Sequence, residues 1–512
     1  AESFWRYFLV LLHVYEIIEK QMIQSRFIYL WFLLLIFMGA GCSSSEPVAE
    51  EILSEQPAIF PDYLDVTIPA NIAPLCFCLE TEIGEEAVAT VSCGTEKLVV
   101  SSGKDGFRIP EKKWKRLLEM AVGKDLEVKV FVNRQGKWVV YQPFRWHVST
   151  DRVDPYLVYR LIEPGYELWN TMGIYQRDLT SFRQTAILTN ESTQHNCMNC
   201  HSFRSQDPSE MLFHMRAKLG GTYLAGKEGV EKLDTKVNED IQTLVYPSWH
   251  PSGSYVAFSV NQTRQAFHMN HSNRIEVYDS ASDVVVYDVR RHEVVTDSLL
   301  SDSGAFETFP TFSPDGKILY FCSATARPMP AEFEQVRYNL CAIGFDSENR
   351  KFGNQVDTLF QVDNLKKSVS FPRVSPDGRF LVFTAASYGN FSIWHKDADL
   401  YLMDLHTRKC IPMTAANSRD VESYHSWSSN SRWLVFSSRR IDGLYTHPYL
   451  VHIDANGVCG KPFIVPQESP DFYRRFLYSF NIPELVKGKV EVNRREVVET
   501  AHRPGIPVTL GK

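Results

Sequence analysis

The sequence predicts an all-β protein, with a β-propeller of about six blades preceded by a small immunoglobulin-like β-sandwich domain. Aromatic residues make up 13% of the 512 residues, and aromatic-rich chains with regular turn signals favour strands. A turn-and-strand pattern recurs through the second half of the chain, and short apolar stretches alternate with turns before it. A chain of this length is expected to form about three domains, or two where one is a large all-β unit.

Four eight-residue segments carry the repeat. In F-P-T-F-S-P-D-G and the similar segments, Pro presets φ, Asp bonds its own backbone and Gly adopts a positive φ, which predicts a hairpin. The first segment has Ser252 in place of Asp, and the fourth lacks the Pro, Asp and Gly. The four segments are Tyr246–Gly253, Phe309–Gly316, Phe371–Gly378 and Tyr424–Ser431. Their turns lie 63, 62 and 53 residues apart, at Pro251, Pro314, Pro376 and Ser429. Such intervals hold four strands each, which is the size of a propeller blade.

Further strands are expected to complete the ring. One more blade is predicted from Pro155–Ile162, Gly173–Arg177 and Thr185–Leu188. Another is predicted from Met211–Arg216 and Gly221–Ala225, which gives six blades. The segment Phe476–Val486 is expected to return and close the ring. In the preceding β-sandwich domain, Pro110–Met120 is the one expected helix.

The N-terminal region predicts an export signal. Phe27–Met38 is an unbroken apolar run that follows Arg26 and precedes Gly39-Ala-Gly-Cys42. A charged start, a short apolar run and small residues before a cleavage site form a secretory signal, and the run is too short for an ordinary membrane-spanning helix. A plain signal peptide and an uncleaved anchor remain alternatives.

Cys42 directly follows small residues, and this segment resembles the lipobox of bacterial lipoproteins, although the usual Leu is replaced by Gly39. The resemblance implies cleavage before Cys42 and diacylation of its thiol. Two acyl chains anchor a protein stably. The predicted organisation is an N-terminal extension and signal peptide (1–41), a lipidated tether (42–58), the β-sandwich (59–148), the propeller (149–490) and a C-terminal tail (491–512).

Cys197-Met-Asn-Cys200-His201 is the sharpest motif in the sequence. C-x-x-C-H is the attachment signature of c-type haem: the two thiols bond covalently to the haem, and His201 is the expected proximal iron ligand. We predict one covalent haem c, in a loop that enters the second blade. A thioredoxin-like redox pair, a zinc knuckle and a structural disulfide are the alternatives.

The sixth iron ligand is less well defined. In a strand, His214 and Arg216 share one face, so His214 is the first candidate for the distal ligand and Arg216 for a contact with a haem propionate. An open sixth site is also possible. The other candidates are Met211, Met215, His195, His250, His268 and His271.

Polar residues near the predicted blade edges form a second candidate group, for a polar ligand or a protein partner. Hydrogen bonds that merely stabilise hairpins are the alternative role. The group contains His395, Asp397, Asp399, Glu422, His425, Arg439 and Arg440.

The S-P-D-G hairpins of two repeats resemble those of TolB-like propellers, and the chain as a whole resembles bacterial TolB-like lipoproteins with an embedded C-x-x-C-H. The resemblance implies a lipid-anchored protein of the cell envelope, on the periplasmic or surface side of the outer membrane. It brings no established biochemical activity with it.

Three functions follow from these features. The first is electron transfer or redox sensing by a membrane-tethered haem, with a redox or envelope protein as partner. The second is a TolB-like protein-binding scaffold in which haem is structural or absent, and the third is a haem enzyme with an open sixth site. A net charge of −7 argues against nucleic-acid binding, and the lack of G-x-S-x-G argues against a serine hydrolase. An electron carrier is therefore expected rather than a catalyst.

Overall fold

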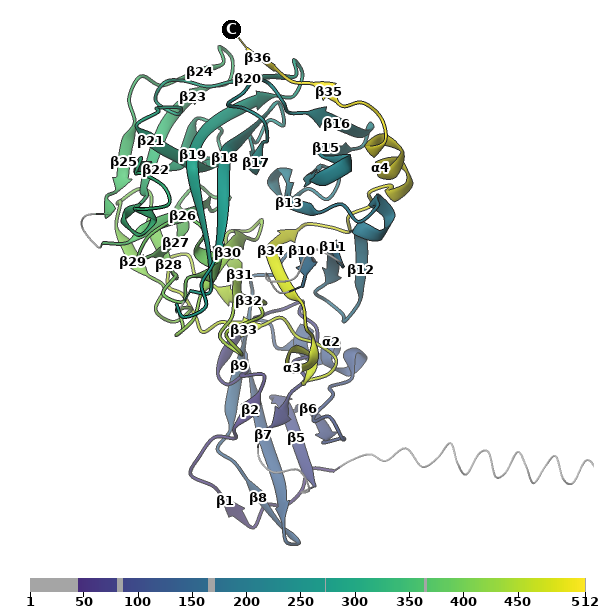
Figure 1. The fold of residues 1–512 in the computed structure, drawn as a ribbon. Coiled ribbons are helices and arrows are strands. Elements are labelled where there is room, and N and C mark those ends of the chain that lie inside the picture. The colour runs from purple at the N-terminus through teal and green to yellow at the C-terminus, as the bar shows by residue number, and fades with distance from the viewer. Residues whose placement is uncertain (1–44, 81–85, 164–170, 272, 363–365, 512) are drawn as a thin grey trace, which may run out of the picture. The chain divides into compact units, whose positions relative to one another are not determined.

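The computed structural model describes residues 45–80, 86–163, 171–271, 273–362 and 366–511, and these fold mainly into strands (Figure 1). The chain divides into two compact units, residues 1–47 and 48–512. The predicted signal and Cys42 lie outside the described residues. Within the described part, no helix is long and apolar enough to span a membrane.

Six sheets form a closed ring of six blades, as the repeats predict. The innermost strand of each blade contacts the innermost strand of the next, and the last contacts the first. In order around the ring, these strands are β34 (Ser479–Val486), β13 (Met198–Phe203), β17 (Val245–Trp249), β21 (Ala305–Phe312), β26 (Ser368–Val374) and β30 (Glu422–Trp427).

The remaining strands follow outward in each blade, antiparallel to their neighbours. Blade 1 continues with β10 (Tyr156–Ile162), β11 (Met172–Asp178) and β12 (Gln184–Thr189). Blade 2 continues with β14 (Met211–Met215), β15 (Gly221–Gly226) and β16 (Gly229–Asp234). Blade 3 continues with β18 (Tyr255–Phe267), β19 (Ile275–Asp288) and β20 (Glu293–Val295).

Blades 4 to 6 have the same order. Blade 4 continues with β22 (Ile318–Thr325), β23 (Asn339–Asp346), β24 (Lys351–Phe352) and β25 (Asp357–Phe360). Blade 5 continues with β27 (Phe380–Ala386), β28 (Asp399–Asp404) and β29 (Cys410–Pro412). Blade 6 continues with β31 (Trp433–Ser438), β32 (His447–His452) and β33 (Phe463–Ile464).

The C-terminal segment closes the ring. β34 lies beside β10 with Tyr156 opposite Val486, so the inner strand of the first blade comes from the end of the chain. The residues beyond it were expected to form a simple tail. They instead form helix α4 (Arg494–Ala501) and strands β35 (Ile506–Pro507) and β36 (Thr509–Leu510), which extend blades 2 and 3 at their outer edges.

The predicted immunoglobulin-like sandwich is not shown by the N-terminal domain. In the described residues, its strands form one seven-stranded sheet and a separate β2–β4 pair. The predicted helix is present as α2 (Glu111–Met120) and buries Trp114. The strands are β1 (Glu51–Ile52), β2 (Ile59–Phe60), β3 (Val66–Pro69), β4 (Cys78–Leu79), β5 (Ala87–Cys93), β6 (Glu96–Ser101), β7 (Asp125–Arg134), β8 (Lys137–Val140) and β9 (Phe144–Ser149).

This domain is bonded to blade 6 of the propeller. The indole N–H of Trp433 donates to the Asp151 carbonyl oxygen at 2.9 Å, and the hydroxyl of Tyr63 donates to the Ile464 carbonyl oxygen at 3.4 Å. Both aromatic side chains are fully buried. The contacts therefore belong to a packed core rather than to a loose linker.

Removal of the closing strand is expected to abolish cooperative folding. A chain that ends at Leu477 lacks β34, so blade 1 loses the inner strand that pairs along β10. The matched control ends at Val492, which keeps β34 and removes only α4, β35 and β36. We expect the control to unfold cooperatively at a lowered Tm and the shorter chain to show no cooperative thermal transition by circular dichroism. A cooperative transition of the shorter chain near the full-length Tm would contradict this account of closure.

Candidate functional site

Every inner strand of the propeller carries the same backbone irregularity. In each blade the pairing register shifts by one residue, as between Asn199 and Ser202 of β13. The extra residue has a left-handed φ of 49° to 54°, although none of the six is glycine. Such residues cost roughly 1–3 kcal/mol each and persist only where the surroundings enforce them. Their repetition in all six blades shows that the same backbone conformation is imposed on every inner strand.

These six left-handed residues meet at the centre and form what we call the plug layer. Rings of blades that are not neighbours touch, because Tyr246 of blade 3 lies 5.9 Å from Phe371 of blade 5 between centroids. Phe309 lies 4.1 Å from Phe371. The plug layer consists of Cys200, Tyr246, Phe309, Phe371, Tyr424 and Ile482.

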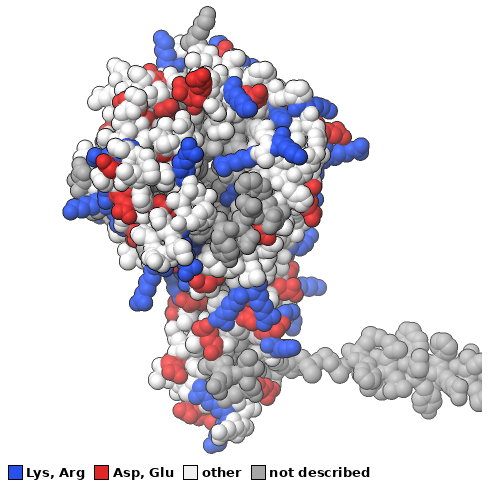
Figure 2. All heavy atoms as spheres, viewed as in Figure 1, with Lys and Arg blue, Asp and Glu red and all other residues white. Residues whose placement is uncertain are grey.

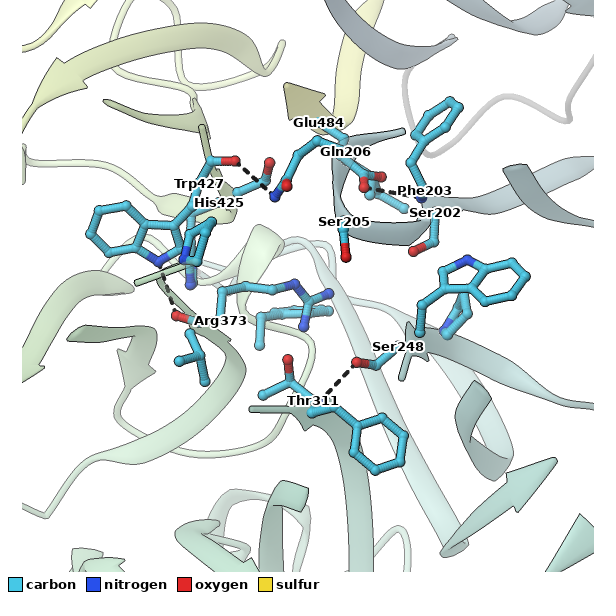
Figure 3. Close-up of a pocket in the computed structure, with 18 of the residues that line it drawn as sticks. Ser202, Phe203, Ser205, Gln206, Ser248, Thr311, Arg373, His425, Trp427 and Glu484 are labelled. Atoms are coloured by element: carbon cyan, nitrogen blue, oxygen red, sulfur yellow. Dashed lines mark hydrogen bonds between the residues drawn. The ribbon is translucent and has the colours of Figure 1, made fainter. Parts of the chain in front are cut away.

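A pocket of about 360 Å³ lies on one side of the plug layer. It has a size within the usual range for small-molecule sites, roughly 300–1,000 Å³. Six residues, each two positions after a plug-layer residue, line it, and we call them the pocket ring (Figure 3). The pocket ring consists of Ser202, Ser248, Thr311, Arg373, Ser426 and Glu484.

Two members of the pocket ring carry charge. Arg373 donates one N–H to the Pro372 carbonyl oxygen at 2.9 Å, and it forms no ion pair within 4 Å among the described residues. Glu484 accepts the Phe203 N–H at 3.0 Å. Burial raises the pKa of Glu484 to about 8, while the Phe203 N–H and the positive charge of Arg373 act in the opposite direction. At neutral pH the ring therefore carries a net positive charge.

The C-x-x-C-H motif lies in this inner layer. It was expected in a loop, but Met198–Phe203 forms the inner strand of blade 2, because Cys200-His201-Ser202-Phe203 occupies the same four positions as Tyr246-Pro-Ser-Trp249 in blade 3. Cys200 and His201 line the pocket, whereas Cys197 packs in the apolar cluster around Met198 and does not line it. Neither Cys197 nor Cys200 is in a disulfide.

His201 meets one requirement of an iron ligand. Its ring is buried, and neither of its nitrogens has a hydrogen-bond partner. Burial, followed by the positive charge of Arg160, lowers the pKa of His201 to about 3, so the imidazole is neutral at physiological pH, as ligation requires. His425 is at the equivalent position of blade 6, and there the ring bonds the Val382 carbonyl oxygen at 2.9 Å. Cys200 could therefore bond a haem in the pocket and His201 could ligate its iron, whereas the second thiol, that of Cys197, does not face the pocket.

The structure does not bring His214 to His201. His214 bonds Thr222 at 2.8 Å and lies against Phe258 of blade 3, whereas the carbonyl groups of Val158 and Ile482, both in blade 1, act on the pKa of His201. The two histidines thus lie on opposite faces of blade 2, because the strand geometry directs them there.

Arg216 is exposed, and its backbone N–H donates to the Cys197 carbonyl oxygen at 2.9 Å. Its positive charge lowers the pKa of the Cys200 thiol, but burial dominates and raises it. The side chain is therefore within electrostatic range of the motif.

Several polar residues at the blade edges contact other protein groups. Glu422 is buried and pairs with Arg440 at 2.9 Å. His395 pairs with Glu276 at 3.0 Å, and the Arg439 guanidinium lies 3.6 Å from the centroid of the Trp394 ring. The first contact lies within blade 6, the second joins blade 5 to blade 3, and the third joins blade 6 to the segment after β27 of blade 5.

Arg373 and Glu484 were missed as site residues. The signal was in the sequence, because the aligned repeats read Y-P-S-W, F-P-T-F, F-P-R-V and Y-H-S-W. A Ser or Thr stands at the third position of all but the third repeat, where Arg373 replaces it. Glu484 required the structure, since only ring closure shows that Ile482-Pro-Glu-Leu485 is the same motif.

No protein-family model and no curated protein matches this sequence. A puromycin-hydrolysing peptidase of Mycobacterium tuberculosis is similar in structure, at 11% identity over 79% of this chain and 57% of that chain, with a TM-score of 0.36. The β-propeller domain of the Trilobed protease from Pyrococcus furiosus matches at 10% identity over 79% and 99%, with a TM-score of 0.33. The periplasmic gluconolactonase PpgL of Pseudomonas aeruginosa matches at 14% identity over 78% and 99%, with a TM-score of 0.31. These likenesses concern the propeller fold and carry no argument about activity.

Truncation of the plug layer is expected to be strongly destabilising. Phe371 is buried against Tyr246, Phe309 and Tyr424, and a buried Phe→Ala change costs about 3–5 kcal/mol. Phe371→Ala should lower the free energy of unfolding by that amount in urea titrations. Phe267→Ala, at a ring that is 61% exposed, is the control and should change it by less than about 0.5 kcal/mol.

Proposed function

We propose that this chain is a membrane-anchored protein of the cell envelope that carries one covalent c-type haem at Cys197 and Cys200 on its β-propeller, and that it acts in electron transfer or redox sensing. The observation that carries the proposal is the C-x-x-C-H motif, of which Cys200 and His201 line the pocket; neither cysteine is in a disulfide, and the His201 imidazole is neutral. A haem held there supplies reversible one-electron chemistry.

The residues of this chain supply the surroundings. The plug layer excludes water from one side of Cys200, since its aromatic rings fill the channel. The His201 ring is buried and forms no hydrogen bond of normal geometry, with the Val158 and Ile482 carbonyl groups as its nearest polar influences. Arg160 and Arg373 add positive charge near the motif, because both act on the pKa values of its neighbours. Positive charge and burial are general means of setting a redox potential.

A second candidate is a TolB-like protein-binding scaffold in which haem is structural or absent. One observation favours it. Cys200-His201-Ser202-Phe203 fits the inner-strand repeat of the other blades, so the blade geometry alone accounts for the position of two motif residues. The face in Figure 2 carries acidic and basic side chains interspersed, without a field of one sign.

Covalent haem is tested directly. We expect a pyridine haemochrome spectrum of c type and a haem-stained band on a denaturing gel when the full chain is produced with a c-type maturation system. Cys197→Ala/Cys200→Ala should lose both signals. Cys410→Ala, which removes a half-buried cysteine outside the motif, should keep them. Absence of haem from the native chain, beside a co-produced cytochrome that is loaded, would overturn the haem proposal and leave the scaffold.

Membrane anchoring has its own test. We propose that Cys42 carries two acyl chains and that the protein sits on a membrane of the envelope. Cys42→Ala should move the protein from the membrane fraction to the soluble fraction, and the native chain should incorporate labelled palmitate. Retention of Cys42→Ala in the membrane without label in the native chain would show that an uncleaved helix, not lipid, holds the protein.

A further inference from the structure

The pocket ring has the features of a preformed small-molecule site, and its six residues do not belong to the haem ligands Cys197, Cys200 and His201. Four of its members are hydroxyl residues, and the other two are Arg373 and Glu484. In Figure 3 the labelled side chains of Ser248, Thr311, Arg373 and Glu484 converge from separate strands on one open space. Convergent polar groups in a cavity of this size are the general mark of a ligand site.

Arg373 is prepared to bind an anion. Among the described residues, its guanidinium donates a hydrogen bond only to the adjacent Pro372 carbonyl oxygen, which leaves the other donors for a ligand. The indole N–H of Trp427 donates to the Arg373 carbonyl oxygen at 3.0 Å, which fixes the backbone from which the side chain projects. A guanidinium with a free edge binds a carboxylate through two parallel hydrogen bonds.

The rest of the ring suits hydroxyl groups. Ser248 accepts the Phe312 N–H at 3.1 Å, so its own proton is free to bond a ligand. One oxygen of Glu484 is held by Phe203 N–H, which leaves the other for a ligand hydroxyl. Trp249 lines the pocket, and its indole N–H is buried without a partner. A Trp offers an apolar face and a single polar donor.

These observations exclude most other ligand classes. An apolar ligand would leave the free donors of Arg373 and Trp249 unsatisfied, which is costly in a buried site. A polyanion such as a nucleotide would meet only Arg373 and Lys487 as cations among the residues that line the pocket. A monoanion with several hydroxyl groups would place its negative charge on Arg373 and its hydroxyl groups on Glu484, Trp249 and the hydroxyl residues of the ring.

We propose that the pocket binds a sugar monocarboxylate of the uronic-acid class, with its carboxylate on Arg373 and a ring hydroxyl on Glu484. The site is independent of the haem proposal, because the pocket ring consists of this chain's own side chains. Cys200 and His201 form part of the same wall, so attached haem and ligand would be neighbours or competitors.

The test is calorimetric titration of the purified mature chain with D-glucuronate and D-galacturonate, beside D-glucose and D-galactose as uncharged counterparts. It is run on the native protein and on Cys197→Ala/Cys200→Ala. We expect at least one acid to bind tenfold or more tightly than its counterpart in one or both forms. The haem content of each sample, measured separately, keeps this result apart from the haem proposal. Acids that bind no better than the neutral sugars, or do not bind, in both forms would overturn it.

Variants designed from the sister blades locate the site. Arg373→Ser and Glu484→Ser introduce the residue that blades 2, 3 and 6 hold at this position, so both are compatible with the strand. Arg373→Ser should weaken binding of the acid at least tenfold and Glu484→Ser several-fold, with a Tm close to native. Thr311→Ser keeps the hydroxyl and should bind as the native chain does. Arg373→Lys, which retains charge without the planar fork, should show an intermediate loss. Native affinity in Arg373→Ser would refute the assignment.

Discussion

The six inner strands depend on one backbone constraint, the bulge that places a non-glycine residue in the left-handed region. Because one extra residue is inserted at the same point in every blade, the side chain at that point is directed to the axis. The side chain two positions later lines the pocket. The plug layer and the pocket ring are thus two consequences of a single local irregularity, repeated six times. Its conformational cost is offset by burial of the aromatic rings that it brings together.

This constraint also changes how the C-x-x-C-H motif is understood. The motif stands where blade 2 needs a plug-layer residue and the residue after it, and Cys200 and His201 occupy those positions. Blade 6 shows what the position does in the absence of cysteine, since Tyr424 enters the plug layer and His425 bonds the preceding blade. The His201 ring forms no hydrogen bond of normal geometry, but the carbonyl groups of Val158 and Ile482 act on its pKa as those of Val382 and Phe371 act on the pKa of His425.

Closure joins the parts of the chain that carry chemistry. β34 arrives from the C-terminus to become the inner strand of blade 1, and with it comes Glu484, which faces the pocket across from Arg373. The two charged members of the pocket ring are more than 100 residues apart in sequence. The outer strands β35 and β36 then bind the end of the chain to blades 2 and 3. The C-terminal segment is therefore fixed both at β34, in blade 1, and at its end.

The sequence by itself determined the blade repeat, the six-bladed ring and the helix at Glu111–Met120, because these depend on local turn chemistry and on apolar periodicity. It also marked Cys197, Cys200 and His201 as residues of one motif. Only the tertiary structure decided that the motif lies in a strand, that His214 and His201 lie on opposite faces of blade 2, and that seven of the nine strands β1 to β9 form one sheet. The physical reason is that strand register, the side on which a side chain emerges and the partner across a ring are set by long-range pairing. Glu484 illustrates this limit, because its sequence neighbours resemble the repeat only after the ring has closed.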